Sequence, residues 1–173
     1  RYGISVKNWD TATISLNNAI LHNRVRNTGL ETADSGGIEL LGRSNLNTGT
    51  RIEGNWIEHT GGIATTSTGQ WLRDHKGYGI YLDDLTSGVT VRNNFLRDTA
   101  WAAVMVHGGH DNTVTNNIGV LGANGESFIR IEWVPLAGAA GIPANNTVTG
   151  NLVSGAVPLG GYVTILSAGQ NAI

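Results

Sequence analysis

The chain has 173 residues, a formal net charge of −2 and no cysteine, which suits one domain with a hydrophobic core. No window approaches 18 consecutive apolar residues and no basic stretch stands out, so we expect neither a membrane span nor nucleic-acid binding. Without cysteine there can be no disulfide, thiolate zinc site or thiol nucleophile.

A short strand pattern recurs along the chain, in which one residue is followed by an apolar, a variable and a second apolar residue. This period of two is typical of a half-buried β-strand, and no segment sustains the i, i+3, i+4 apolar spacing of a helix. The six copies of the pattern are residues 3–6, 37–40, 79–82, 103–106, 128–131 and 162–165.

A second pattern alternates with the first and has an Asn as its fourth residue. Its copies are residues 52–56, 91–95, 114–118 and 148–152, and an early variant at 16–20 has Ala in place of that Asn. Such an Asn predicts a bend between two strands, where its amide can bond the backbone and the Asn of the next repeat. The four residues concerned are Asn55, Asn94, Asn117 and Asn151.

Strands this short cannot bury a face alone, so neighbouring repeats must stack on one another. The sequence therefore predicts an all-β fold, a parallel β-helix of about six coils, with residues 1–173 as a single domain. Because the pattern runs to both ends of the chain, we expect it to be a segment of a longer protein.

Several stretches carry a resemblance to a known family. Residues 79–84, 91–94, 106–112 and 116–118 resemble the right-handed parallel β-helix repeats of pectate-lyase-like proteins. The resemblance implies a right-handed solenoid and a carbohydrate-active protein that binds a polysaccharide or oligosaccharide. It also implies a secreted or cell-surface location, although the chain opens without a signal-peptide pattern. It does not select an activity, because the superfamily includes lyases, hydrolases, epimerases, tailspikes and adhesins.

Stacking would bring residues that are far apart in the chain into one column. Three residues after the first apolar position, successive coils carry Asp83, His107 and Glu132. Adjacent coils lie about 4.8 Å apart, so the two carboxylates would be roughly 10 Å apart. The neighbouring outward register supplies flanking candidates for substrate binding, namely Glu39, Tyr81 and Arg130.

These residue types suit the hydrolysis of a glycosidic bond. That reaction uses two carboxylates, about 5 Å apart for retention of configuration and about 6.5–9.5 Å apart for inversion. We expect Asp83 and Glu132 to be the acid and the base, with Asp84 as a further carboxylate and His107 holding or protonating either acid. We expect no metal; a calcium ion at Asp83 and Asp84, or a simple turn cap, is the alternative interpretation of that pair.

The order of the site also resembles polygalacturonase-type glycoside hydrolases, which carry Asn-Thr-Asp, Asp-Asp, Gly-His-Gly and Arg-Ile-Lys on successive coils. The similar runs here are residues 83–84, 107–109 and 130–132. Asn-Thr-Asp is missing, the His precedes both glycines, and Glu132 stands in place of the Lys. A neutral sugar therefore suits this chain better than galacturonan.

Insertions interrupt the repeats beside the column. Residues 60–78 lead into the Asp83 strand, 27–36 lead into the Glu39 strand, and 135–146 follow the Glu132 strand. Long loops on a rigid scaffold often carry binding groups, so we expect them to flank a groove. Residues 60–78 could instead form a degenerate extra coil around 63–65. Further candidate contacts with a sugar are Trp71, His110 and Trp133.

Two other functions stay open beside glycoside hydrolysis. A lyase or epimerase acting on uronates would need a cation and a base, which Lys7, Arg130 and His107 could supply. A structural or glycan-binding segment, as in a tailspike, adhesin or filament, would bind without turnover. In that interpretation His107 and His110 belong to a tight turn, and Arg130 and Glu132 form an exposed ion pair.

Overall fold

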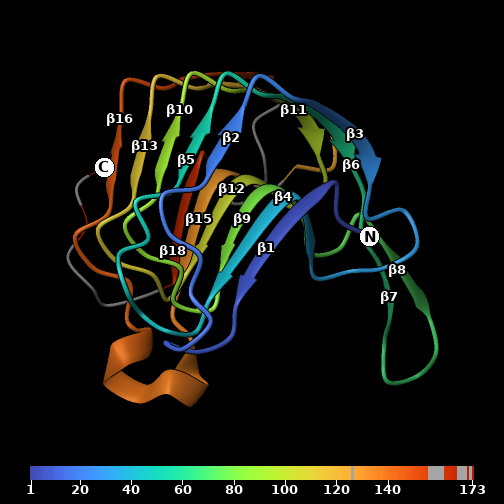
Figure 1. Cartoon of the computed structure of the whole chain (residues 1–173). Helices are drawn as coiled ribbons and strands as arrows, with labels where there is room; N and C mark the ends of the chain where they lie inside the picture. Colours follow the sequence, from blue (N-terminus) through green and yellow to red (C-terminus); the bar gives the residue numbers. More distant parts are fainter. Residues whose placement is uncertain (126, 156–161, 167–170, 172) are drawn as a thin grey trace.

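The computed structural model describes residues 1–125, 127–155, 162–166, 171 and 173. Within these residues the regular structure consists of eighteen β-strands and one 3-10 helix, η1 (Pro135–Gly141). All strands but two pair in parallel (Figure 1). The chain therefore has an all-β fold of parallel sheets, as the alternating pattern predicts.

The largest sheet has six strands, whose order in the sheet is their order along the chain. Each copy of the first sequence pattern lies in, or overlaps, one of these strands. They are β1 (Ile4–Asn8), β4 (Ser35–Gly42), β9 (Gly77–Asp83), β12 (Ala102–His107), β15 (Ser127–Glu132) and β18 (Val163–Leu166).

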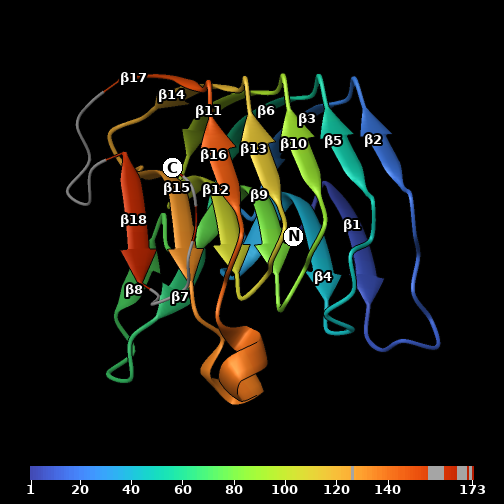
Figure 2. The same ribbon diagram turned by 90° about the vertical axis from the view of Figure 1, so that its left-hand side faces the viewer.

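Two five-stranded sheets follow the same rule, and the chain visits the three sheets in turn (Figure 2). The second sheet contains β2 (Ala19–Leu21), β5 (Arg51–Glu53), β10 (Thr90–Arg92), β13 (Thr113–Thr115) and β16 (Thr147–Thr149). The third contains β3 (Arg24–Thr28), β6 (Trp56–Thr60), β11 (Phe95–Thr99), β14 (Ile118–Leu121) and β17 (Leu152–Gly155).

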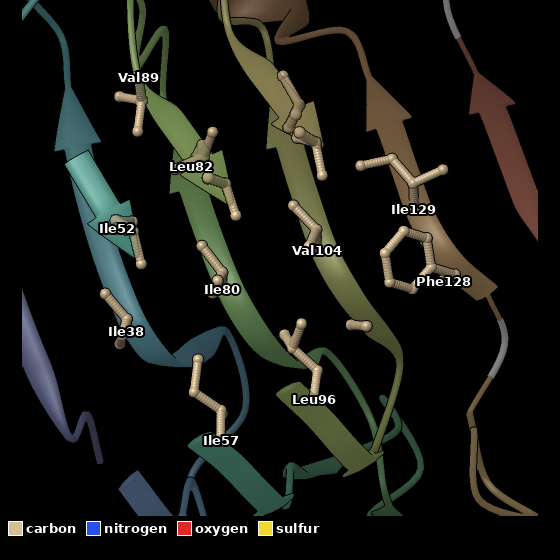
Figure 3. Close-up of a cluster of buried hydrophobic side chains, with 14 of the residues drawn as sticks. Ile38, Ile52, Ile57, Ile80, Leu82, Val89, Leu96, Val104, Phe128 and Ile129 are labelled. Carbon is tan, nitrogen blue, oxygen red and sulfur yellow. The ribbon is translucent and has the colours of Figure 1, made fainter. Parts of the chain in front are cut away.

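Aliphatic side chains from all three sheets form one core (Figure 3). In the six-stranded sheet Ile38, Ile80, Val104 and Ile129 pair in one register, and all four side chains are fully buried. Burying each such side chain stabilises the fold by about 1.5–3 kcal/mol. A slip of one residue would turn the whole row outward, so the core fixes the register of the strands.

The recurrent Asn forms a ladder at the bend between the second and third sheets. Nδ2 of Asn94 donates to Oδ1 of Asn117 at 2.9 Å and to the carbonyl oxygen of Ile52 at 2.9 Å. The backbone N–H of Asn94 donates to the same Asn117 oxygen. Asn55 makes the equivalent contacts with Asn94. The predicted role is confirmed, and the ladder runs through Asn23, Asn55, Asn94, Asn117 and Asn151.

Residues 60–78 do not form an extra coil, so that alternative is wrong. They contain β7 (Ile63–Thr65) and β8 (Trp71–Arg73), which pair antiparallel in a hairpin apart from the parallel sheets (Figure 1). The N–H of Gly69, at φ 82°, donates to the carbonyl of Thr66 and closes the turn. Because of this turn, β7 pairs with β8 and not with a strand of the parallel sheets.

The segment after β15 forms η1, which lies beyond the carboxyl ends of the strands of the six-stranded sheet (Figures 1 and 2). Pro135 begins the helix, where its missing N–H needs no partner. No helix in the described part of the chain has the length and apolar character needed to cross a membrane.

Candidate functional site

The strand pairing confirms the predicted register on the outer face of the six-stranded sheet. Lys7 pairs with Leu41, and Leu41 pairs with Asp83. His107, one strand further along, pairs with Glu132. Leu82 and Val106, which directly precede Asp83 and His107, point into the core. Because successive side chains of a strand point to opposite faces, the column faces outward.

Asp83, Asp84 and His107 form a cluster at the carboxyl ends of β9 and β12. Nδ1 of His107 lies 3.0 Å from Oδ1 of Asp83 and 3.8 Å from Oδ1 of Asp84. The backbone N–H of Asp84 donates to the same Asp83 oxygen at 2.8 Å. All three side chains are partly exposed, so the cluster is held in place and remains open to a ligand.

The neighbours of His107 favour its protonated form. Burial lowers its pKa, but the hydrogen bond with Asp83 and the negative charges of Asp83, Asp84 and Glu132 outweigh that effect. The net result is a pKa raised above the ordinary value of 6.5. An imidazolium held against a carboxylate is a group that can deliver a proton to a substrate.

The backbone is strained on both sides of β9. Asp84 (φ 36°) and Leu85 (φ 67°) follow the strand in the left-handed region, and Lys76 (φ 48°) precedes it in the same region. The other non-glycine residues of this kind in the described part of the chain are Asn, Asp or His, which tolerate positive φ better. Such strain concentrates at functional sites, where the surrounding fold maintains it.

One hydrogen bond to the neighbouring strand and one within the turn keep the strained turn in place. The N–H of Leu85 donates to the carbonyl of His107 at 2.9 Å, and the hydroxyl of Thr86 donates to the carbonyl of Asp83. A Cβ on Gly109 would lie 1.9 Å from the carbonyl oxygen of Thr86. Glycine is therefore required at Gly109 because the turns after β9 and β12 touch, which explains one glycine of the His-Gly-Gly run.

A groove of about 620 Å³ opens over the cluster. Its walls carry Asp34 and Tyr81 as well as Asp83, Asp84 and His107. Aromatic and cationic side chains complete much of the lining, namely Arg1, Tyr2, Lys7, Trp9, Arg43 and Lys76. Mixed aromatic and charged walls suit a polar ligand that has apolar ring faces, such as a sugar.

Arg43 and Asp34 are among the groove residues that were not site candidates in the sequence, and both bond residues of the site. Nε of Arg43 donates to Oδ2 of Asp84 at 2.8 Å, and the hydroxyl of Tyr81 donates to Oδ1 of Asp34 at 3.1 Å. Asp34 belongs to the 27–36 insertion, whose position beside the column was a usable signal. Arg43 is two residues after Leu41 and one residue past the end of β4, on the same strand that contributes Leu41 to the column.

Tyr81 lies in the groove as predicted, although it is almost fully buried. Burial raises its pKa, and the nearby charges of Asp83 and Asp34 raise it further. The phenol therefore stays protonated and acts as a hydrogen-bond donor to Asp34.

Glu132 and Arg130 pair with each other. Nε of Arg130 donates to Oε1 of Glu132, and the guanidinium lies 5.5 Å from the ring centre of Trp101. The described lining of the groove includes neither residue. The structure thus keeps the predicted vertical neighbours together but gives Glu132 a cationic partner of its own.

The sequence suggested that Glu39 contacts a substrate, but its side chain does not reach the groove surface. Its side chain is 1% exposed and its carboxylate pairs with Lys7. Burial raises the pKa of Glu39, and the bond to Lys7 acts in the opposite direction. Tyr81, which pairs with Glu39 on the next strand, packs with Tyr78 and Met105 in a buried cluster. Glu39 therefore supports Lys7 from below and makes no direct contact with a ligand in the groove.

Three further candidates lie outside the described lining of the groove. Trp71 is 70% exposed on the β7–β8 hairpin. Trp133 is exposed beside η1, and its Nε1 donates to the carbonyl of Gly138 at 3.0 Å. His110 contacts Asp111 and the backbone carbonyl of Asn45, which agrees with the interpretation of a turn tied to the backbone.

Asp83, Asp84 and His107 are also the residues that could hold a cation. One ligand atom from each side chain lies within 4.8 Å of the others. Two carboxylates and an imidazole are a mixed oxygen and nitrogen donor set, whereas calcium takes six to eight oxygen atoms. The three side chains alone therefore do not make a calcium site, and a bound calcium ion would need further oxygen ligands.

No protein-family model matches this chain, and a search of curated proteins finds no match either. Function must therefore be argued from the geometry of the site.

Proposed function

We propose that this protein is a right-handed parallel β-helix that hydrolyses a polysaccharide, with Asp83, Asp84 and His107 as its reaction centre. The β-helix interpretation is supported by three parallel sheets visited in turn and by an Asn ladder at one bend. The proposal includes a secreted or cell-surface location, because the resemblance to pectate-lyase-like proteins implies one.

The contact between Asp83 and His107 carries the proposal. A carboxylate and an imidazole at 3.0 Å can share a proton, and Asp84 places a second carboxylate beside them in a groove of about 620 Å³. The turn that follows Asp83 holds Asp84 and Leu85 at positive φ, and the fold maintains this strain at some cost in stability.

The spacing of the carboxylates favours a retaining mechanism. Asp83 and Asp84 each have an oxygen within 4.8 Å of the other, which is shorter than the separation of about 6.5–9.5 Å that inverting enzymes use. Asp84, held by Arg43, attacks the anomeric carbon, while the Asp83–His107 pair protonates the departing glycosidic oxygen. Water then releases the sugar from Asp84, and the Asp83–His107 pair takes a proton from that water.

A second arrangement uses Asp83 and Glu132, as the sequence suggested. The two residues are two strands apart in the sheet, roughly 10 Å, which approaches the spacing of an inverting enzyme. The anomeric configuration of the first product, read by NMR, separates the two arrangements. Retention supports Asp83 with Asp84, and inversion supports Asp83 with Glu132.

The test of the function is hydrolysis of a panel of plant, algal and bacterial polysaccharides. We expect Asp83→Asn and Asp84→Asn each to lower kcat by about a hundredfold or more, since acid–base and nucleophilic groups contribute at least that much. Glu132→Gln should retain most of the activity. Asp98→Asn, an exposed carboxylate on the third sheet, is the matched control. Unchanged turnover in both the Asp83 and Asp84 variants would remove the mechanism.

Four cations in the groove favour a second candidate, a lyase or epimerase acting on uronates. Arg1, Lys7, Arg43 and Lys76 could neutralise a substrate carboxylate, and His107 could take the neighbouring proton. An unsaturated product that absorbs in the ultraviolet would identify a lyase. Affinity for a glycan without any turnover would instead indicate a binding segment.

A further inference from the structure

A second hollow adjoins the reaction centre. It has a volume of about 310 Å³ and lies between η1 and the turns that follow β4 and β9. Its lining consists of Arg43, Asp84, Leu85, Val134 and Ala137. The volume is at the lower end of the range for small-molecule sites, which suits one sugar residue better than a chain.

One wall of this pocket is apolar. Leu85 and Val134 are each 8% exposed, and Ala137 joins them from η1. A Cβ on Gly108 would lie 2.7 Å from Cγ2 of Val134 and 3.0 Å from Cδ2 of Leu85. The glycine thus lets these two side chains close over the turn, and the strained backbone of Leu85 keeps its side chain there.

The opposite edge of the pocket is polar and continuous with the groove. Arg43 and Asp84 line both spaces, and they bond to each other at 2.8 Å. A sugar residue in the pocket would therefore have its anomeric carbon near Asp84 while the rest of the substrate lies in the groove.

From this we infer that the pocket binds a sugar residue that carries a methyl group. The methyl is that of a 6-deoxy sugar, an O-methyl ether or an O-acetyl ester. A free hydroxyl pressed against Leu85, Val134 and Ala137 would lose its hydrogen bonds to water without replacement. A methyl group at the same place gains from burial. The role of Asp84 at the anomeric carbon rests on the proposed function, whereas binding of the methyl group in the pocket does not.

The first experiment fills the pocket. Ala137→Trp should block it, and Ala139→Trp, an exposed position of the same helix outside the pocket, is the matched control. Substrates are nitrophenyl glycosides in pairs that differ only by a 6-deoxy, O-methyl or O-acetyl group, which separates the three sources of the methyl. We expect the wild type to prefer one methylated member by about ten- to a hundredfold in kcat/KM. Ala137→Trp should abolish this preference and Ala139→Trp should preserve it.

A second variant changes polarity without changing the backbone. Leu85→Asn places at φ 67° a residue that tolerates that conformation, and it replaces the apolar side chain with an amide. We expect the preference for the methylated sugar, measured as the ratio of the two kcat/KM values, to fall at least tenfold. A melting temperature measured beside the kinetics identifies any loss that comes from unfolding.

Equilibrium binding separates failure of the pocket from failure of the proposed reaction. Saturation-transfer NMR on the Asp83→Asn variant follows the same glycosides without turnover. Selective contact of the methyl group that is lost in Ala137→Trp supports the pocket even if the wild type hydrolyses nothing. Equal binding of both members of every pair, or equal effects of Ala137→Trp and Ala139→Trp, overturns the inference whether or not the protein is a hydrolase.

Discussion

Nδ1 of His107 lies 3.0 Å from Oδ1 of Asp83, although the two residues are 24 positions apart in the chain. The contact exists because β12 pairs in parallel with β9, so the ends of the two strands lie side by side. It links the fold to the proposed chemistry, since the pairing of strands determines which acid meets the imidazole. It also makes Asp83 the carboxylate that does most to favour the protonated form of His107.

Asp83→Asn should lower the pKa of His107. Burial already lowers that pKa, and the hydrogen bond and charge of Asp83 are the first of the effects that raise it, so their removal leaves burial less opposed. A titration of the His107 ring followed by NMR measures the shift. Asp74→Asn is the control. Asn tolerates the φ of 54° at this position, and the Asp74 side chain bonds Asn124 instead of His107. An unchanged pKa in Asp83→Asn would show that the contact does not govern the protonation of the ring.

The stability of the protein should also depend on pH through His107. A group whose pKa is raised by folding contributes its full stabilisation below its unfolded pKa, here near 6.5, and loses it as pH rises through the folded value. The difference in unfolding free energy between wild type and His107→Asn should therefore be larger at about pH 5.5 than at about pH 9. Urea unfolding at both values tests this, and a difference that grows with pH would contradict it.

The register of the column could be predicted from the sequence because it follows from a repeated local rule. Each copy of the first pattern has apolar residues at every second position, and one buried row fixes the whole set. The register therefore transfers from Ile38 and Ile80 to Asp83 and His107 without knowledge of the loops.

The walls of the groove could not be predicted in the same way. The sequence places Asp34 and Arg43 near the column, but no periodic pattern specifies their contacts with Tyr81 and Asp84. The ion pair of Glu132 with Arg130 was the alternative interpretation of these residues, and the structure contains it, since both residues lie on the same outward face. The hairpin at 60–78 depends on a local turn at Thr66–Gly69, which the spacing of the repeats does not specify.

Asn94→Ala should destabilise the fold by about 3 kcal/mol, since it strips partners from several buried polar groups that each cost about 1–3 kcal/mol when left unpaired. The Asn94 side chain donates to Ile52 and Asn117 and accepts from both nitrogens of Asn55. Asn47→Ala removes one exposed bond to Asp111 and should cost less than about 1 kcal/mol. Chemical denaturation compares the two variants, and equal losses would mean that the ladder adds little beyond an ordinary surface bond.

Lys7→Met should cost about 2 kcal/mol, because it leaves the carboxylate of Glu39 buried without its cation. Burial lowers the pKa of Lys7, but the bond and charge of Glu39 raise it more, so the amine stays charged and paired. One oxygen of Glu39, Oε2, is already buried without a hydrogen-bond partner in the structure, which leaves the carboxylate dependent on Lys7. The double variant Lys7→Met with Glu39→Gln removes the stranded charge and should recover about half of the loss or more. Arg92→Met, at the exposed pair with Glu53, should cost only about 0.5 kcal/mol. Urea unfolding of the four proteins closes the comparison: if Lys7→Met and Arg92→Met cost the same, or if the double variant is less stable than Lys7→Met alone, Glu39 is not held in its buried position by Lys7.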